Sequence, residues 1–193
     1  MQSVMDAIDA GLIDGKIVLV ISDKQDAYAL ERARKAGIQT AVIRKRDFSA
    51  LEDFHRANLA AVHEANVDGV ILAGYLSILG SELVEEYRGR IINIHPSLIP
   101  SFCGKGYYGV RVHRAVLEYG AKVSGATVHF VDEGADTGPI IMQRTVPVLE
   151  DDGPEDLAAR VLKVEHQMLP ECVALFCRDA LVIEGRKVRI LEK

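Results

Sequence analysis

Several features that mark particular classes of protein are missing from this sequence. Its 193 residues include only three cysteines, Cys103, Cys172 and Cys177, without C-x-x-C spacing, which argues against a disulfide framework and against a cysteine metal site. No apolar run approaches the roughly 20 residues of a membrane-spanning helix, and the acidic, amphipathic amino-terminal segment is unlike a secretory signal. Basic residues (23) are outnumbered by acidic ones (28), so a basic surface for nucleic acid is not expected. These absences predict a soluble, cytoplasmic protein.

What is present suits one α/β domain. Hydrophobic residues make up 49% of the chain, short apolar runs alternate with amphipathic segments, and there are no repeats or linkers. Asp26 and the pair Ser49 and Glu52 are placed to cap helices, and Gly37 and Gly120 to end them. Strands are predicted at 16–22, 40–43, 68–74, 90–95, 124–131 and 138–148, helices at 26–37, 49–64, 81–87, 111–120 and from 154, and a terminal hairpin at 181–191. The pattern predicts a single-domain, Rossmann-like open sheet, mostly parallel with antiparallel carboxyl-terminal strands.

The first candidate site residues are Asn93 and His95, at the end of the strand "RIINIH". Residues two apart in a strand point to the same side, and ligands of open α/β sheets bind beyond the carboxyl ends of the strands. Pro96 ends the strand there. An amide and an imidazole on one face suit the stabilisation of a developing oxyanion, with the histidine also acting as an acid. A structural histidine at a strand end is the alternative.

An acidic turn, "DEGADTG", supplies a second candidate. It places Asp132, Glu133 and Asp136 between two strands, and a carboxylate close to His95 would keep the imidazole protonated. The alternative is a solvated turn that only contributes to solubility.

Four motifs together resemble one known family. "INIHPSLIPSF", "SGATVHFVDEGADTGPII", "LAGYLSIL" and "ARVLKVEHQMLP" are similar to segments of the phosphoribosylglycinamide formyltransferases, within the wider formyltransferase superfamily. The resemblance runs along the whole chain. It implies transfer of a formyl group from 10-formyltetrahydrofolate, as co-substrate, to the amine of glycinamide ribonucleotide in purine biosynthesis. It also implies small-molecule substrates, with no metal, nucleic acid or membrane, and leaves a homo-oligomer open.

The resemblance implies a role for individual residues. Asn93, His95 and Asp136 match the catalytic asparagine, histidine and aspartate of the family. The segment of Leu76, Ser77, Ile78 and Leu79 matches the lining of the pterin pocket, which Asn93 also contacts. Glu165 matches a glutamate that receives the sugar hydroxyls of the nucleotide, and His129 and Thr127 match supporting residues beside the site. One domain over 1–193 is implied, with a nucleotide-binding half at about 1–95 and a folate-binding, catalytic half at about 96–193.

The chain departs from this family at its amino end. Members usually begin with a strand and a G-x-G-S-N loop that holds the nucleotide phosphate, and Met1 aligns inside the helix that follows that loop. We therefore expect the first strand to be lacking and an unpaired strand edge to be left beside "KIVLVIS". Two alternatives stay open at this stage: a 10-formyltetrahydrofolate hydrolase, and an impaired folate- or nucleotide-binding relative.

Overall fold

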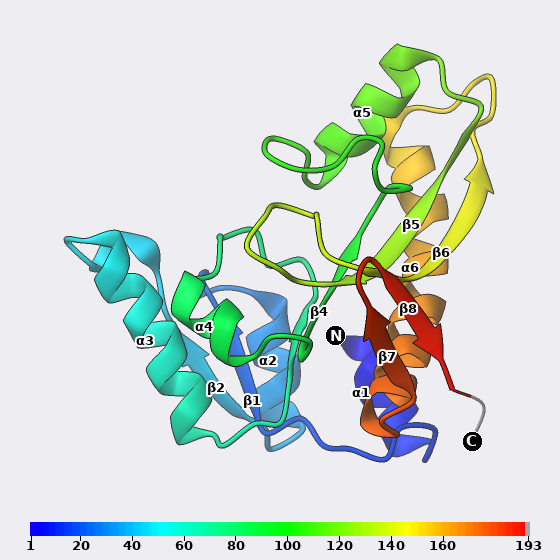
Figure 1. The fold of residues 1–193 in the computed structure, drawn as a ribbon. Helices are drawn as coiled ribbons and strands as arrows, with labels where there is room; N and C mark the ends of the chain where they lie inside the picture. Colours follow the sequence, from blue (N-terminus) through cyan, green and yellow to red (C-terminus); the bar gives the residue numbers. More distant parts are fainter. Residues whose placement is uncertain (192–193) are drawn as a thin grey trace.

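A computed structural model describes residues 1–191, and it shows the alternating strands and helices predicted from the sequence (Figure 1). Every predicted strand and helix is present, and most of the strands are shorter than their apolar runs. The helices are α1 (Gln2–Asp9), α2 (Tyr28–Lys35), α3 (Leu51–Glu64), α4 (Ser81–Glu86), α5 (Val110–Tyr119) and α6 (Pro154–Cys177), with a 3₁₀ turn η1 (Lys45–Asp47). The strands are β1 (Leu19–Ser22), β2 (Gln39–Val42), β3 (Val70–Leu72), β4 (Ile91–His95), β5 (Val123–Phe130), β6 (Ile140–Pro147), β7 (Leu181–Glu184) and β8 (Lys187–Ile190).

The helix ends were predicted better than the helix starts. Gly37 and Gly120 follow α2 and α5 with φ of 71° and 76°, the left-handed conformation that glycine adopts most easily. The caps predicted at Asp26 and Ser49 are wrong. Helices α2 and α3 are preceded by Ala27 and Ala50, so each polar residue lies one position too early, and no side-chain cap forms.

The strands form two separate sheets rather than one. β1 and β2 pair in parallel, while the six-stranded sheet has the order β3-β4-β5-β6-β8-β7. β3 and β4 are parallel, β5 is antiparallel to both β4 and β6, and β7 and β8 form the predicted terminal hairpin. The predicted open sheet, parallel at first and mixed at the end, is therefore confirmed, but it is divided between β1 and β3.

The two faces of the sheet are covered by two hydrophobic clusters. One packs α1 and α6 against the sheet through residues such as Ile92, Val161 and Met168, and the other packs α3 and α4 through residues such as Val62 and Leu83. Successive residues of β4 enter opposite clusters, because Ile91 belongs to the second and Ile92 to the first. Asn93 and His95 therefore share the face of Ile91.

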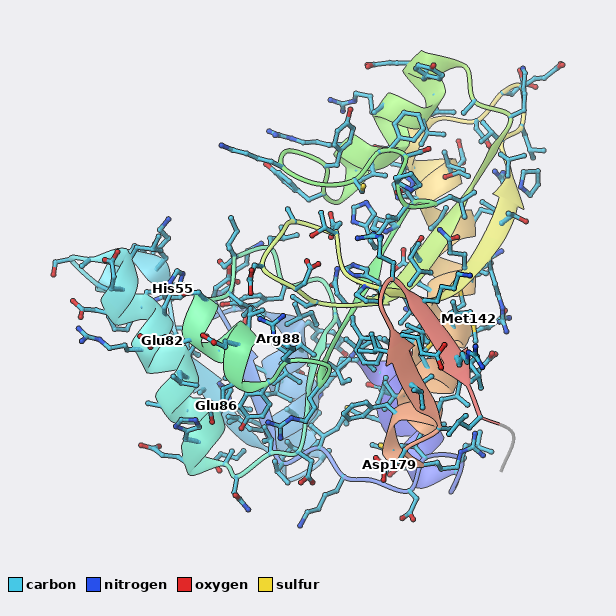
Figure 2. The ribbon with its side chains drawn as sticks, in the orientation of Figure 1. His55, Glu82, Glu86, Arg88, Met142 and Asp179 are labelled. Carbon is cyan, nitrogen blue, oxygen red and sulfur yellow. The ribbon has the colours of Figure 1, made fainter. Side chains whose placement is uncertain are left out.

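The helices of the second cluster approach each other closely. A Cβ atom on Gly80 would meet the His55 side chain, and Figure 2 shows His55 of α3 beside Glu82 of α4. None of the helices within residues 1–191 is both long enough and apolar enough to cross a membrane.

Candidate functional site

The candidate site forms where β4 ends and the β5–β6 turn meets it. Asn93 and His95 lie opposite His129 and Thr127 of the antiparallel neighbour β5. The turn after β5 brings the Asp136 carboxylate to 3.5 Å from Nδ1 of the buried His95. The structure thus brings together the amide, the imidazole and the carboxylate proposed from the sequence, although 43 residues separate Asn93 from Asp136.

Asp136 is held by the backbone as well as by side chains. Its φ of 58° is left-handed, a conformation that aspartate tolerates better than most residues, and its Oδ2 accepts a hydrogen bond from the Gly104 N–H at 2.8 Å. Burial alone would raise the pKa of this carboxyl. The hydrogen bond from the Gly104 N–H and the nearby charge of His95 favour the carboxylate, and the pKa of Asp136 is lowered from its ordinary value. The carboxylate is therefore the stable form in the site.

Both ring nitrogens of His95 face hydrogen-bond acceptors. Nε2 lies 3.0 Å from the carbonyl oxygen of Phe102, and Nδ1 faces Asp136. The hydroxyl of Ser97 donates to the Ser101 carbonyl at 2.6 Å and lies 3.2 Å from the Phe102 carbonyl, so it is a weaker neighbour of the latter. A doubly protonated ring satisfies both acceptors. Nδ1 lies 3.5 Å from Asp136, farther than Nε2 lies from the Phe102 carbonyl. The Nδ1–H can therefore donate to a substrate oxygen instead.

His129 fixes the orientation of the Asn93 amide. His129 Nδ1 lies 2.7 Å from the carbonyl oxygen of Phe130, so this nitrogen carries the proton and donates to it. In the neutral ring Nε2 is then an acceptor, and the Asn93 Nδ2–H donates to it at 3.1 Å. The second N–H of the amide faces Asp136 at 3.5 Å, a long contact that a substrate carbonyl can replace.

We expect His129→Leu to lower kcat about tenfold with little change in KM, because the Asn93 amide would lose the acceptor that orients it. His129→Gln retains a side-chain oxygen that can accept the same bond and should keep more of the activity. Steady-state kinetics of both variants, with circular dichroism to confirm folding, make the comparison. Equal losses in the two variants would show that His129 acts by packing alone.

Thr127 anchors the loop that follows β4. Its buried hydroxyl donates to the carbonyl of Ser97 at 2.6 Å and accepts from the Ile99 N–H at 3.1 Å. The Gln143 side chain of β6 donates to the Thr127 hydroxyl and to the Ile99 carbonyl. This network holds the chain immediately after His95 and therefore limits how far the imidazole can move.

The segment predicted to line a pterin pocket follows β3, the strand that pairs with the strand of Asn93. Leu72, the last residue of β3, is in register with Asn93, and residues 76–79 follow at the same edge of the sheet. Leu76 and Ile78 are 55% and 77% exposed, and the Ser77 hydroxyl donates to Asp23 at 3.0 Å. Exposed aliphatic side chains with a polar side chain at their edge suit an aromatic ring system with polar edges.

Glu165, predicted to contact substrate, lies apart from Asn93, His95 and Asp136. Within residues 1–191 no hydrogen bond or ion pair joins it to Asn93, His95 or Asp136, and its charged neighbour is the amino group of Met1. Burial raises the pKa of Glu165 to about 7, and the Met1 charge offsets part of this effect. At neutral pH its carboxyl can therefore donate as well as accept.

We expect Glu165→Gln to stabilise the protein at pH 8 but not near pH 5. A carboxyl with its pKa raised from 4.5 to about 7 favours folding while protonated, and this contribution is lost as the pH rises through about 7. Glutamine cannot ionise, so the melting temperature should rise by a few degrees at pH 8, at about 2–4 °C for each kcal/mol in a chain of this size.

The matched control is Glu171→Gln, on the same helix but in a surface pair with Arg144. Thermal unfolding of wild type and both variants at the two pH values makes the measurement. A stability change in Glu165→Gln that is the same at pH 5 and pH 8 would contradict the assignment.

Several residues of the site were not found from the sequence. The Phe102 carbonyl and the Gly104 N–H contribute only backbone atoms, which carry no signal in the residue type. Asp23 accepts a hydrogen bond from Ser77, which is 54 positions later in the sequence. His113 on α5 is buried with an unpartnered Nδ1, and burial together with the charge of His95 lowers its pKa. Only the three-dimensional fold places these groups at the site.

The chain belongs to the formyl transferase family, whose sequence profile matches residues 1–173. Among curated relatives, it is 44% identical over 172 residues to the chloroplastic phosphoribosylglycinamide formyltransferase of Arabidopsis thaliana, covering 89% of this chain. It is 39% identical over 181 residues to the phosphoribosylglycinamide formyltransferase of Escherichia coli K12, covering 94% of this chain and 83% of that protein. A solved structure, glycinamide ribonucleotide transformylase 1 from Symbiobacterium toebii, aligns over 99% of this chain and 88% of its own with a TM-score of 0.93 and 44% identity.

The extent of overlap differs between relatives. This chain spans 59% of the Arabidopsis protein and 58% of the chloroplastic enzyme of Vigna unguiculata. The structure of a formyltetrahydrofolate deformylase from Pseudomonas syringae also aligns, with a TM-score of 0.88 and 27% identity, but this chain covers 61% of it.

Proposed function

We propose that this protein transfers the formyl group of 10-formyltetrahydrofolate to the amine of glycinamide ribonucleotide, a step of purine biosynthesis. The observation that carries the proposal is the meeting of Asn93, His95 and Asp136 at the end of β4, in a chain 39–44% identical to curated phosphoribosylglycinamide formyltransferases. Family membership supports formyl transfer, and the names of these relatives support the acceptor.

The site chemistry agrees with an acyl transfer between nitrogens. Attack of the acceptor amine on the formyl carbon places negative charge on the formyl oxygen. The Asn93 N–H that faces Asp136 and the Nδ1–H of His95 would then be its donors, and a donor of this kind is worth about 3–4 kcal/mol in other enzymes. Asp136 compensates the charge of His95, and proton transfer from the attacking nitrogen to the leaving nitrogen completes the reaction.

We assign the two substrates to two different segments of the chain. The pterin ring would lie against Leu76, Ile78 and Leu79, with Ser77 held by Asp23 at the edge of that surface. The ribose hydroxyls would bind Glu165, whose raised pKa suits a group that both donates and accepts. Catalysis would combine Asn93 and His95 of β4 with Asp136 of the turn after β5, so it joins the half at about 1–95 with the half at about 96–193.

Formyl transfer is tested by following release of tetrahydrofolate with and without glycinamide ribonucleotide. Release that depends on the acceptor supports the proposal. Release at the same rate without acceptor identifies a hydrolase instead, and binding of both ligands without turnover identifies a non-catalytic relative.

A further inference from the structure

The carboxyl-terminal hairpin contacts the turn that carries Asp136. The hairpin is formed by β7 and β8, which Figure 1 shows in red beside the turn between β5 and β6. At its tip, Arg186 Nη2 donates to the Thr137 carbonyl oxygen at 3.1 Å, across 49 positions of the sequence. Next to this contact, Lys187 of β8 pairs in parallel with Ile140 of β6. The tip of the hairpin therefore lies against the residue that follows Asp136.

The turn itself has few backbone contacts. Among residues 1–191, the stretch 133–137 makes no hydrogen bond between two backbone groups. Its internal hydrogen bonds come from the Asp132 side chain, whose Oδ1 accepts from the Gly134 N–H at 3.1 Å and from the Thr137 hydroxyl at 2.5 Å. Neither bond fixes the Thr137 carbonyl. Asp136, whose φ of 58° is left-handed, therefore depends on contacts from outside the turn to keep this conformation.

The chain beyond Thr137 has little room to move. A Cβ atom on Gly138 would come within 1.8 Å of the Phe130 carbonyl oxygen, and the Phe130 N–H donates to the Pro139 carbonyl at 2.9 Å. The Thr137 carbonyl lies at the junction between this closely packed base and the less supported turn. A donor that holds this carbonyl limits rotation of its peptide group and so limits how far Asp136 can move.

A second arginine contacts the same turn but holds it less directly. Arg88 Nη2 lies 2.7 Å from Glu133 Oε1, and the two side chains are 64% and 67% exposed. Water competes for such a pair, and the Glu133 side chain can rotate without moving the backbone. Arg186 is also exposed, but it binds a backbone atom, and its planar guanidinium loses little freedom in doing so. The two arginines are therefore not equivalent.

We propose that Arg186 is a positioning residue, which holds the turn so that the Asp136 carboxylate stays beside His95 and the Gly104 N–H. Its effect on turnover rests on the formyl transfer proposed above, whereas its effect on the turn does not. A hydrogen bond of this kind shifts a local equilibrium by about threefold to tenfold. Because the left-handed conformation of Asp136 is disfavoured by a comparable factor, loss of the bond would let a large share of the molecules leave the active arrangement.

The test compares Arg186→Ala and Arg186→Lys with the matched control Arg189→Ala. Arg189 lies on the same hairpin and pairs with Glu184 at 2.8 Å, with 70% of its side chain exposed. Amide hydrogen exchange, measured by NMR, reports at the Gly104 N–H whether the Asp136 carboxylate is in place. The buried Ile99 N–H of the same loop reports any general loosening. Steady-state kinetics with both substrates varied give kcat and KM.

We expect Arg186→Ala to speed exchange at Gly104 about fivefold and to lower kcat by a similar factor, with KM changed less than about twofold and exchange at Ile99 unchanged. Arg186→Lys keeps a charged donor and should recover most of both losses. Arg189→Ala should match wild type.

Three results would overturn the proposal. They are wild-type exchange at Gly104 in Arg186→Ala, equal acceleration at Gly104 and Ile99, which would mean that Arg186 acts on general stability, and faster exchange at Gly104 with kcat unchanged. Faster exchange at Gly104 alone, in a protein whose wild type transfers no formyl group, would support the role of Arg186 in holding the turn and contradict the proposed function.

Discussion

Replacing His95 with alanine should lower kcat by about 100-fold or more while KM changes much less. The imidazole lies at the end of β4, with Nε2 hydrogen-bonded to the Phe102 carbonyl and Nδ1 facing Asp136. Alanine removes the Nδ1–H, a donor that we expect to act mainly on the transition state. Asn93→Ala should show the same pattern. The measurement is steady-state kinetics with both substrates varied.

His63→Ala is the matched control for His95→Ala. His63 lies on α3, with 46% of its side chain exposed, and pairs with Glu86 on the surface. Its removal should leave kcat and KM unchanged. Near-wild-type turnover in His95→Ala, in a variant that folds as His63→Ala does, would remove His95 from the mechanism.

Asp136→Asn should also lower kcat by about 100-fold, within the range expected for loss of a group that supports proton transfer. Asparagine keeps the shape of the side chain and can still accept from the Gly104 N–H, but it no longer compensates the charge of His95. The loss should appear in kcat more than in KM, because the charge matters most when the proton moves.

The same variant makes a prediction about stability and pH. The pKa of Asp136 is lowered in the folded protein, so its carboxylate stabilises the fold fully above the ordinary value of 3.8, and this contribution is lost as the pH falls through the lower, folded value. Wild type should therefore be more stable than Asp136→Asn at neutral pH, and the difference should shrink in strong acid. Chemical unfolding at several pH values measures it.

Glu133→Gln is the matched control, since it removes one charge from the same turn but from a side chain that pairs with Arg88 on the surface. It should leave both activity and acid stability close to wild type. Equal effects of the two substitutions would mean that the charge of the turn, rather than the position of Asp136, is what matters.

Hydrophobic patterning was sufficient to predict the elements of the fold. Apolar runs such as the one that contains Ile91 and Ile92 identify strands because both faces of a parallel sheet are covered, and Gly37 and Gly120 identify helix ends because of their left-handed φ. The helix starts were predicted less well. A capping residue must occupy one particular position, and Ala50 rather than Ser49 occupies it in α3.

The candidate site was predicted in part from residue chemistry and in part from resemblance. The spacing of Asn93 and His95 placed them on one face of β4, but nothing local showed that Asp136 would reach them. That contact depends on the antiparallel pairing of β4 with β5, which sets where the following turn lies. Glu165 was matched by resemblance alone, and its proximity to the Met1 amino group is a property of how α1 packs on α6.

The Asp136 carboxylate contacts both the loop after β4, through the Gly104 N–H, and the imidazole of His95. The same oxygen that accepts from the Gly104 N–H is the one that faces His95. A ligand that binds the Asp136 carboxylate must weaken the hydrogen bond from the Gly104 N–H, and so loosen the segment from Phe102 to Gly106. A ligand that orders this segment must in turn fix the position of the carboxylate. Ligand affinity and segment order are then thermodynamically linked, each altering the other by the same free energy.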